Sequence, residues 1–367
     1  MNTLVTLATY ERSKTAYFLK EELERENIDC YFSIVSAPGK RLENVKVQVK
    51  DDDVEKAIRI MFRIKEEYGA DIEDIEPLVK CNRIMVPVDF SLNSEYACYY
   101  AIHIARVLKS EIKLLHIYEN PVSDMNIKES ATFEDYVKQT LRDKEIQKKE
   151  DIMDFTHKMK AYMSSHEIED VKIHSSIVMG NIYQEMKGIC RIYCPDIVVL
   201  GSMGKEEGTK SGLATLVSEL TSSLKVPVYV IPGPSTLKDF EKMNILYATD
   251  FNENEHASLD QLISLMEPFN NQITCIHIDT AQNPAKNERM DELNAFLEKD
   301  YGQHEISCQL IESKDVYHGI KEFADRNRHN LLSFTIQKRG IFDKLFRPNL
   351  YKKILQEANI PILVFPS

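Results

Sequence analysis

The strongest constraint on the fold of this chain is an internal repeat. The segment RIMVPVDFSLNSEYA at 83–97 matches NILYATDFNENEHAS at 244–258, and each is an apolar run that ends in Asp-Phe before a polar stretch. The two aspartates, Asp89 and Asp250, are 161 residues apart. Two further pairs follow in the same order: KLLHIYEN (113–120) with TCIHIDTA (274–281), and VPVYVIP (226–232) with IPILVFP (360–366). Self-similarity of this kind predicts two copies of one structural unit.

Within each copy, apolar strand-like runs alternate with helix-like segments. Near-continuous apolar runs are typical of strands that helices cover on both faces. The alternation predicts a mostly parallel sheet with right-handed crossovers. We expect the long charged stretch 128–166 to be mainly an enlarged helical crossover with a solvated face. In the first copy the expected strands are 83–88, 112–117, 171–178, 196–200 and 226–231, and the expected helices are about 92–109, 133–166, 181–193 and 215–224.

The chain divides into three expected segments. Residues 1–76 belong to neither copy and show strand-like and helix-like runs that suit a small α+β module. The stretch PGPSTLKDFEKMN opens with Pro, Gly and Ser and continues with polar residues, which is typical of a linker. We therefore expect the α+β module at 1–76, the first copy at 80–233 and the second at 242–367.

Composition and charge exclude several classes of protein. The chain is 43% hydrophobic and 28% charged, as in folded domains, and its net charge of −12 does not suit a nucleic-acid binder, which needs a basic surface. The N-terminus does not resemble a secretion signal, and no apolar run is long enough to span a bilayer. Seven scattered cysteines without a CxxC pair favour reduced thiols over zinc ligands. These features predict a cytoplasmic protein with no membrane or nucleic-acid partner.

The stretch 195–232 carries the main candidate for ligand chemistry. An apolar strand runs into Gly201-Ser-Met-Gly204, and we expect a helix to start near Ala214 and Thr215. Glycines let backbone N–H groups approach an anion, and a helix N-terminus favours phosphate. The loop between them also carries Lys205, Gly208, Lys210 and Gly212. Neither a Walker A nor a dinucleotide motif is present, so the loop alone fits a phosphate site and an ordinary connection equally well.

Together with the repeat, this loop resembles the universal stress protein family over roughly 80–367. Nucleotide-binding members of that family carry G-x2-G-x9-G-[S/T] after the fourth strand. Gly201, Gly204 and Thr215 match this pattern, whereas Ala214 replaces the third glycine. The resemblance implies an α/β fold of two tandem doubly wound, five-stranded parallel-sheet domains, similar to adenine-nucleotide alpha hydrolases, with strand order 3-2-1-4-5. We expect two separate sheets related by a pseudo-twofold axis. The N-terminal module resembles small signal-transducing modules and carries no site residues.

The resemblance also implies a site for ATP or AMP in the first copy, with Mg²⁺ accompanying ATP. Its implied residues are Asp89 for the ribose or adenine edge, Pro87 and Val88 flanking the base, Ile117 lining the adenine pocket, and Gly201, Gly204, Ala214 and Thr215 in the phosphate loop. An alternative role for Asp89 is to cap the following helix with Ser91. Lys205 and Lys210 are added from charge alone, and their interpretation as solvated loop lysines is the better one.

The second copy departs from the family pattern at this loop. When the copies are aligned from their last proline, Thr335 and Lys338 replace the two loop glycines, and Pro348 and Asn349 replace Ala214 and Thr215. A proline has no N–H to donate to an anion. The basic and aromatic stretch SFTIQKRGIFDKLFRPNLYKKIL fits either a structural copy with a basic face or a surface for an anionic partner.

The most economical functional hypothesis is a stress-response or signalling protein that binds an adenine nucleotide in its first copy. The alternative is a structural or protein-interaction module in which both sites are vestigial. No catalytic motif is present, and we interpret His116 and His277 as core residues, so slow ATP hydrolysis is the most activity we expect. We further expect the copies to pair as an intramolecular pseudo-dimer, with unidentified protein partners and at most a weak homodimer of whole chains.

Overall fold

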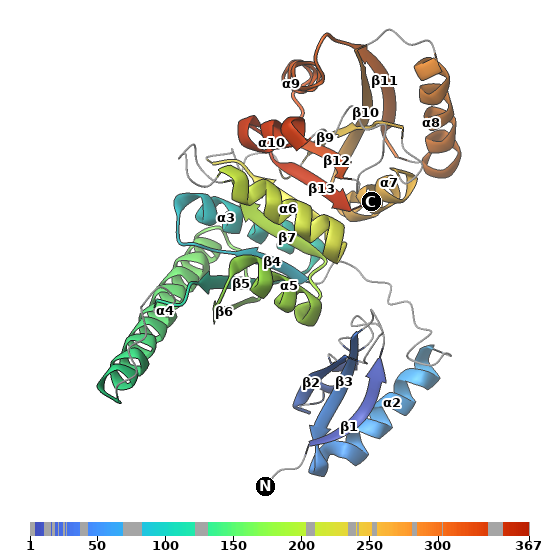
Figure 1. Ribbon diagram of the computed structural model, residues 1–367. Helices are drawn as coiled ribbons and strands as arrows, with labels where there is room; N and C mark the ends of the chain where they lie inside the picture. The colour runs from blue at the N-terminus through green and yellow to red at the C-terminus, as the bar shows by residue number, and fades with distance from the viewer. Residues whose placement is uncertain are drawn as a thin grey trace. The chain divides into compact units, whose positions relative to one another are not determined.

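The computed structural model describes most of the chain and divides it into two compact units, one formed by 1–80 with 189–194 and the other by 81–188 with 195–367 (Figure 1). The described residues are 4–10, 16, 19–20, 22–24, 26, 28–36, 43–68, 83–121, 131–202, 210–233, 240, 242–251, 255–280, 285–302, 304–336 and 348–366. Gly204, Lys205 and Lys338, which the sequence analysis singled out, lie outside them.

The N-terminal unit contains a three-stranded antiparallel sheet and a helix. Its elements are β1 (Leu4–Tyr10), β2 (Cys30–Ser36), β3 (Glu43–Lys50), a 3₁₀ turn η1 (Asp51–Asp53) and α2 (Val54–Tyr68). The strand order is β1-β3-β2. Val47 and Val49 of β3 are fully buried together with Ala57 and Ile64 of α2, so one face of the sheet and one face of the helix form a small core. The unit is therefore an α+β fold, as expected.

The second unit contains the two repeats around one sheet. The elements of the first copy are β4 (Arg83–Pro87), α3 (Leu92–Leu108), β5 (Glu111–Tyr118), α4 (Ala131–Ser165), β6 (Ile173–Met179), α5 (Ile182–Tyr193), β7 (Ile197–Gly201), α6 (Lys210–Leu224) and β8 (Val228–Ile231). Those of the second copy are β9 (Met243–Ala248), α7 (Glu255–Met266), β10 (Asn271–Asp279), α8 (Ala285–Tyr301), β11 (Ile306–Glu312), α9 (Val316–Arg326), β12 (Leu331–Ile336), α10 (Pro348–Glu357) and β13 (Ile362–Pro366). The alternating α/β architecture is confirmed.

The strand order within each copy is also as expected. The full order is β11-β10-β9-β12-β13-β8-β7-β4-β5-β6, which gives 3-2-1-4-5 in both halves. The registers repeat as well: Ile84 pairs with Ile112 in the first copy, and Ile245 pairs with Ile273 in the second. Because these pairs are related by the same 161-residue offset as the sequence repeat, the two copies share their backbone pairing and not only their topology.

The expectation of two separate sheets was wrong, because the last strands of the copies pair with each other. β13 runs antiparallel to β8, with Leu363 opposite Tyr229, and this pairing joins the halves into one ten-stranded sheet. Each last strand would otherwise present unpaired backbone N–H and C=O groups at an edge. The pairing buries Tyr229, Leu363 and Phe365 completely within a hydrophobic core that extends across both copies. The two copies therefore form a pseudo-dimer within one chain.

Helices add a second contact between the copies. The Tyr351 hydroxyl of α10 donates a 2.9 Å hydrogen bond to the Ala214 carbonyl of α6, and both residues are buried. Tyr229 of β8 reaches the Met266 sulfur of α7 at 4.0 Å. The copies are thus joined through their sheet edges and through helices that belong to different copies.

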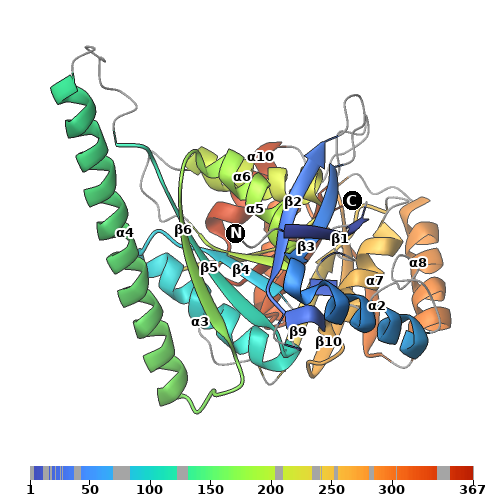
Figure 2. The same cartoon turned by 90° about the horizontal axis from the view of Figure 1, so that it is seen from below.

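The crossover α4 is the largest difference between the copies. It has 35 residues, whereas its counterpart α8 has 17. Ile152, Phe155 and Met159 are buried on α4, which lies beside the edge strand β6 (Figure 2). The expected enlarged crossover is therefore present. None of the helices in the described part of the chain has the length and apolar character that crossing a bilayer requires.

Candidate functional site

The candidate site lies where the strand order reverses in the first copy. β4 and β7 are neighbours, although the chain passes from β4 to β5 and β6 on one side before it returns to β7 on the other. In open α/β sheets, ligands bind at such a switch point, outside the carboxyl ends of the strands. The predicted residues Asp89 and Gly201 come from these two strand ends, so the fold brings them to the same edge of the sheet.

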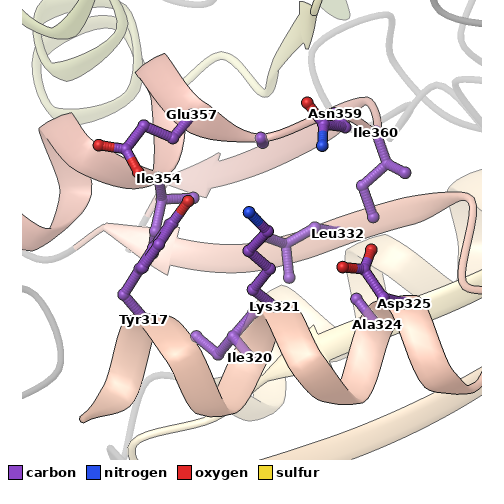
Figure 3. Close-up of a pocket in the computed structure, with 11 residues that line it drawn as sticks. Tyr317, Ile320, Lys321, Ala324, Asp325, Leu332, Ile354, Glu357, Asn359 and Ile360 are labelled. Atoms are coloured by element: carbon purple, nitrogen blue, oxygen red, sulfur yellow. The ribbon is translucent and has the colours of Figure 1, made fainter.

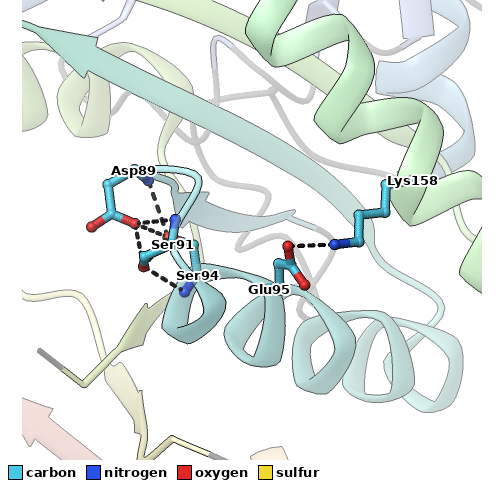
Figure 4. A network of polar contacts seen from close by, with 5 residues as sticks. All are labelled: Asp89, Ser91, Ser94, Glu95 and Lys158. Carbon is cyan, nitrogen blue, oxygen red and sulfur yellow. Dashed lines mark hydrogen bonds and ion pairs between the residues drawn. The ribbon is translucent and has the colours of Figure 1, made fainter. Parts of the chain in front are cut away.

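Asp89 is held by the first turn of α3. Its Oδ1 accepts hydrogen bonds from the Ser91 N–H at 3.0 Å and the Ser91 hydroxyl at 2.6 Å, and also from the Ser94 hydroxyl. Ser91 is the N-cap of α3 and accepts a bond from the Ser94 N–H at 3.3 Å. In Figure 4 the second carboxylate oxygen of Asp89 points away from these residues. The capping role that sequence offered as an alternative is therefore present, and it uses one oxygen of an exposed carboxylate.

The same hydrogen bonds favour the ionised form of the Asp89 carboxyl group. Partial desolvation acts to raise the pKa of this carboxyl, but the bonds from Ser91 and Ser94 together outweigh it, and the pKa lies below its ordinary value. Asp89 is consequently ionised at neutral pH. An ion pair, 2.5 Å between Glu95 and Lys158, ties the start of α3 to α4 (Figure 4). The N-terminal turn of α3 is thus fixed on both sides of the carboxylate.

Two residues that sequence did not assign to the site shape the turn after β4. Phe90 has a left-handed backbone, with φ 67°, and its ring packs against that of His116, tilted by 34°, at a centroid distance of 4.2 Å. His116 Nδ1 lies 2.7 Å from the Val88 carbonyl oxygen. His116 is a buried core residue, as expected, and its Nε2 has no hydrogen-bond partner among the described residues. The imidazole therefore anchors the backbone that presents Asp89.

The second copy repeats this anchor. Phe251 has φ 62° and stacks on His277 at 4.4 Å, and His277 Nδ1 lies 2.8 Å from the Thr249 carbonyl oxygen. A non-glycine residue in the left-handed region is uncommon, so its occurrence at both Asp-Phe pairs indicates a shared structural need. The repeated Asp-Phe dipeptides and the paired histidines were the sequence signals from which this turn could have been inferred.

Gly201 is required for packing between β7 and α3. A Cβ atom at this position would lie 2.5 Å from the Asn93 carbonyl oxygen, 2.7 Å from the Asn93 carbonyl carbon and 3.1 Å from the Ser94 nitrogen. All three are backbone atoms of the first turn of α3, so none can swing aside. The glycine lets the end of β7 approach the turn that holds Asp89. This is a different use from the close approach to phosphate that the sequence suggested.

The predicted start of the helix after the phosphate loop was wrong. α6 begins at Lys210, and Ala214 and Thr215 lie inside it, so Thr215 does not cap the helix. Ala214 is 4% exposed and its carbonyl binds Tyr351, whereas Thr215 is exposed. The first turn of α6 meets α5 instead, through a 3.4 Å hydrogen bond from the Tyr183 hydroxyl to the Gly212 carbonyl.

The residues predicted to surround the base are exposed to different degrees. Pro87 and Ile117 are half-buried near the carboxyl ends of β4 and β5. Val88 is 5% exposed, its N–H donates to Leu115 at 2.9 Å, and its carbonyl meets His116. Val88 therefore lies beneath the turn, and Pro87 and Ile117 offer the more accessible apolar surface. No group of three or more His, Cys, Asp or Glu side chains within the described ranges is placed to hold a metal ion.

The corresponding end of β12 in the second copy is filled by side chains. Thr335, which replaces Gly201, is buried and its hydroxyl lies 2.9 Å from that of Tyr247. Pro348 is the first residue of α10, a position at which the missing N–H costs the helix nothing. These features agree with the loss of the loop pattern in this copy.

A hollow elsewhere in the second copy lies between α9 and α10 (Figure 3). Ile320 and Ile354 line it from the two helices and Leu332 from β12, while the charged residues Lys321 and Glu357 also border it. The Lys353 ammonium lies 4.2 Å from the centre of the Tyr317 ring. The hollow involves none of the residues predicted from the phosphate-loop pattern.

The fold is a doubly wound α/β fold similar to that of the adenine-nucleotide alpha hydrolases. Residues 80–232 match the model of the universal stress protein family. No curated protein sequence matches the chain.

Some solved structures align with most of this chain. The chain is similar to a universal stress protein from Archaeoglobus fulgidus, with 16% identity and a TM-score of 0.56 over 78% of this chain and 99% of that one. A putative universal stress protein from Pseudomonas aeruginosa has 14% identity and a TM-score of 0.48, over 78% of this chain and 93% of that one. At this identity the first likeness establishes the fold alone.

Proposed function

We propose that the chain is a stress-response protein that binds an adenine nucleotide, ATP or AMP, at the crevice between β4 and β7 of its first copy. The observation that carries the proposal is the carboxylate of Asp89, which is ionised and held by Ser91 and Ser94 through one oxygen only. The proposal treats 80–233 as the ligand-binding domain of a three-segment, cytoplasmic chain with modules at 1–76 and 242–367.

The nucleoside would contact the carboxyl ends of β4 and β5. The second oxygen of Asp89 suits a ribose hydroxyl or an adenine amino group, because an ionised carboxylate accepts hydrogen bonds but cannot donate them. Pro87 and Ile117 offer half-buried apolar surface for a flat base. Val88 supports this surface from below, since its side chain and both backbone groups are already engaged.

The phosphates would lie toward the loop between β7 and α6. α6 starts at Lys210, so its positive N-terminal end lies five residues closer in sequence to Gly201 and Gly204 than a helix start at Thr215 would. Gly204 stays in the proposal on the sequence pattern alone, and Thr215 offers at most its exposed hydroxyl. Mg²⁺ would enter with ATP, held by phosphate oxygens and water. Because the sequence carries no catalytic motif, we propose binding and, at most, slow hydrolysis.

Calorimetric titration of ATP and AMP into matched variants tests the proposal. Asp89→Ala removes a charged hydrogen-bond partner of the ligand and should weaken binding by about 10- to 100-fold. Asp250→Ala changes the equivalent residue of the second copy and should leave the affinity unchanged. In the loops, Gly204→Val should weaken binding whereas Lys338→Ala should not.

The contrary result has a defined meaning. Wild-type protein that binds neither nucleotide at millimolar concentration would overturn the proposal and favour the second candidate, a protein-interaction module. The burial of Ala214 and its bond to Tyr351 favour that candidate, because they commit the third position of the loop pattern to contact between the copies. Equal losses in Asp89→Ala and Asp250→Ala would also contradict the assignment to the first copy.

A further inference from the structure

Two cysteines lie directly opposite each other in the second copy. Cys275 of β10 and Cys308 of β11 are register partners in adjacent parallel strands. Neighbouring strands are about 4.8 Å apart, and the Cα atoms of a disulfide are usually about 4.4–6.8 Å apart. Register partners in a parallel pair also point to the same face of the sheet. The backbone therefore already places the two thiols within reach of one covalent bond.

The two thiols are in contact but differ in their access to solvent. The Cys308 side chain forms a hydrogen bond with that of Cys275. Cys275 is fully buried, whereas Cys308 is half-buried. Both belong to the core on the face covered by α8, which buries Leu293 and Leu297 there. Of the two thiols, only that of Cys308 is accessible to a reagent in solution, because Cys275 is fully buried.

The hydrogen bond also favours the reactive form of Cys308. It lowers the pKa of the Cys308 thiol, against the opposing effects of partial burial and of Glu298. Burial has the opposite result for Cys98 and Cys190, where it raises the pKa of the thiol. Thiol–disulfide exchange proceeds through the thiolate, so a lowered pKa and partial exposure direct the first attack to Cys308.

We propose that Cys275 and Cys308 form a reversible disulfide when the chain meets a small-molecule disulfide. The Cys308 thiolate attacks one sulfur of the reagent, forms a mixed disulfide and releases one thiol. The Cys275 thiolate then attacks Cys308 Sγ, closes the Cys275–Cys308 bond and releases the second thiol. The two protein thiols lose two electrons and two protons, which convert one small disulfide into two small thiols.

The sheet geometry makes this bond easy to reverse. Typical Cβ–Cβ separations are about 3.8 Å in a disulfide, and parallel strands hold opposing residues about 1 Å farther apart than this. Closing the bond must therefore draw β10 and β11 together. Strained disulfides have higher reduction potentials and are reduced more readily than relaxed ones. Because β11 is an edge strand of the ten-stranded sheet, it can move without displacing a further strand.

The test exposes folded, reduced full-length protein to glutathione disulfide, blocks remaining thiols by alkylation and maps the products by mass spectrometry. Before alkylation, the expected product is lighter than the reduced chain by two hydrogen atoms and should return to the starting mass with dithiothreitol. After alkylation, its digest should contain a linked Cys275–Cys308 peptide. A stable glutathione adduct on Cys308 without the link, or two unmodified thiols, would overturn the proposal.

Variants separate the two steps. Cys275→Ser should stop the reaction at the mixed disulfide on Cys308, and Cys308→Ser should remove the reaction at this pair altogether. Cys194→Ser changes a half-buried cysteine outside the pair and should leave the linked peptide unchanged. Circular dichroism of each variant checks folding, and the wild-type product decides the question if Cys275→Ser does not fold. A linked peptide that forms only in urea would also contradict the proposal.

Discussion

Replacing Gly201 with alanine tests the closest approach between two elements at the candidate site. The added Cβ would lie 2.5 Å and 2.7 Å from the Asn93 carbonyl oxygen and carbon. Real Cβ atoms do not come this close to backbone, so either β7 or the first turn of α3 must move. That turn carries Ser91 and Ser94, which hold Asp89. The substitution should therefore strain the sheet–helix contact and loosen the cap at the same time.

The magnitude follows from two contributions. Overpacking a well-packed site costs about 1–3 kcal/mol, and weakening an N-cap costs about 1 kcal/mol. We expect Gly201→Ala to lower the free energy of unfolding by about 2–4 kcal/mol. At about 2–4 °C per kcal/mol for a large domain, Tm should fall by about 4–16 °C.

Scanning calorimetry of the full chain measures this change. The two units are of unequal size, so the transition with the larger enthalpy belongs to the repeat unit, and the shift should occur there. Gly188→Ala is the matched control, because nothing lies within 4 Å of a Cβ at this position in α5. Alanine is the better helix former by about 0.8–1.0 kcal/mol, so this variant should be unchanged or more stable.

The essential result is that Gly201→Ala lowers the Tm, whereas Gly188→Ala leaves the Tm unchanged or raises it. A Gly201→Ala protein with the Tm of the wild type would refute the packing argument, because it would mean that the site accepts a methyl group without strain. Equal destabilisation by Gly188→Ala would show that the effect does not depend on the neighbours of Gly201.

Two further predictions concern the contact between the copies and the charge of the candidate site. Tyr351→Phe removes the hydrogen bond to the Ala214 carbonyl and should destabilise the repeat unit by about 1 kcal/mol in chemical denaturation. The control Tyr136→Phe, at an exposed position of α4, should have no effect on stability. Equal losses of stability in the two variants would contradict the role of the bond. Because the folded chain lowers the pKa of Asp89, the stabilisation by its carboxylate should be complete above the ordinary value of 3.8 and should disappear as pH falls below it. The stability difference between wild type and Asp89→Asn should therefore shrink in acid, and a difference that grows would reverse the assigned shift.

Much of the fold could be predicted from the sequence because each element of the first copy has a matching element in the second. An apolar run that fits a parallel strand is ambiguous alone, but two runs at a 161-residue offset with the same neighbours must pair in the same way. The matched registers of Ile84 with Ile112 and Ile245 with Ile273 express this constraint. The joining of β8 to β13 could not be predicted, because edge pairing depends on how two finished sheets meet and leaves no periodic signal in either strand.

The candidate site was only partly predictable for a similar reason. Asp89 could be placed at a strand end, but the use of Gly201 depends on the Asn93 backbone, more than 100 residues away in sequence. A glycine motif indicates that space is needed and does not identify what occupies it. The start of α6 was misjudged because Gly212 suggested a loop, whereas glycine is tolerated in the first turn of a helix.

The single chain that holds both copies also removes a rule that constrains symmetric dimers. In a homodimer every substitution at a twofold interface appears on both sides at once, so each contact must be compatible with its rotation-related copy. Here the bond from Tyr351 to Ala214 has no reciprocal, because the positions that correspond to them in the opposite copies are Val217 and Pro348. Because both copies lie in one chain, a substitution can strengthen one side of the interface without changing the other side.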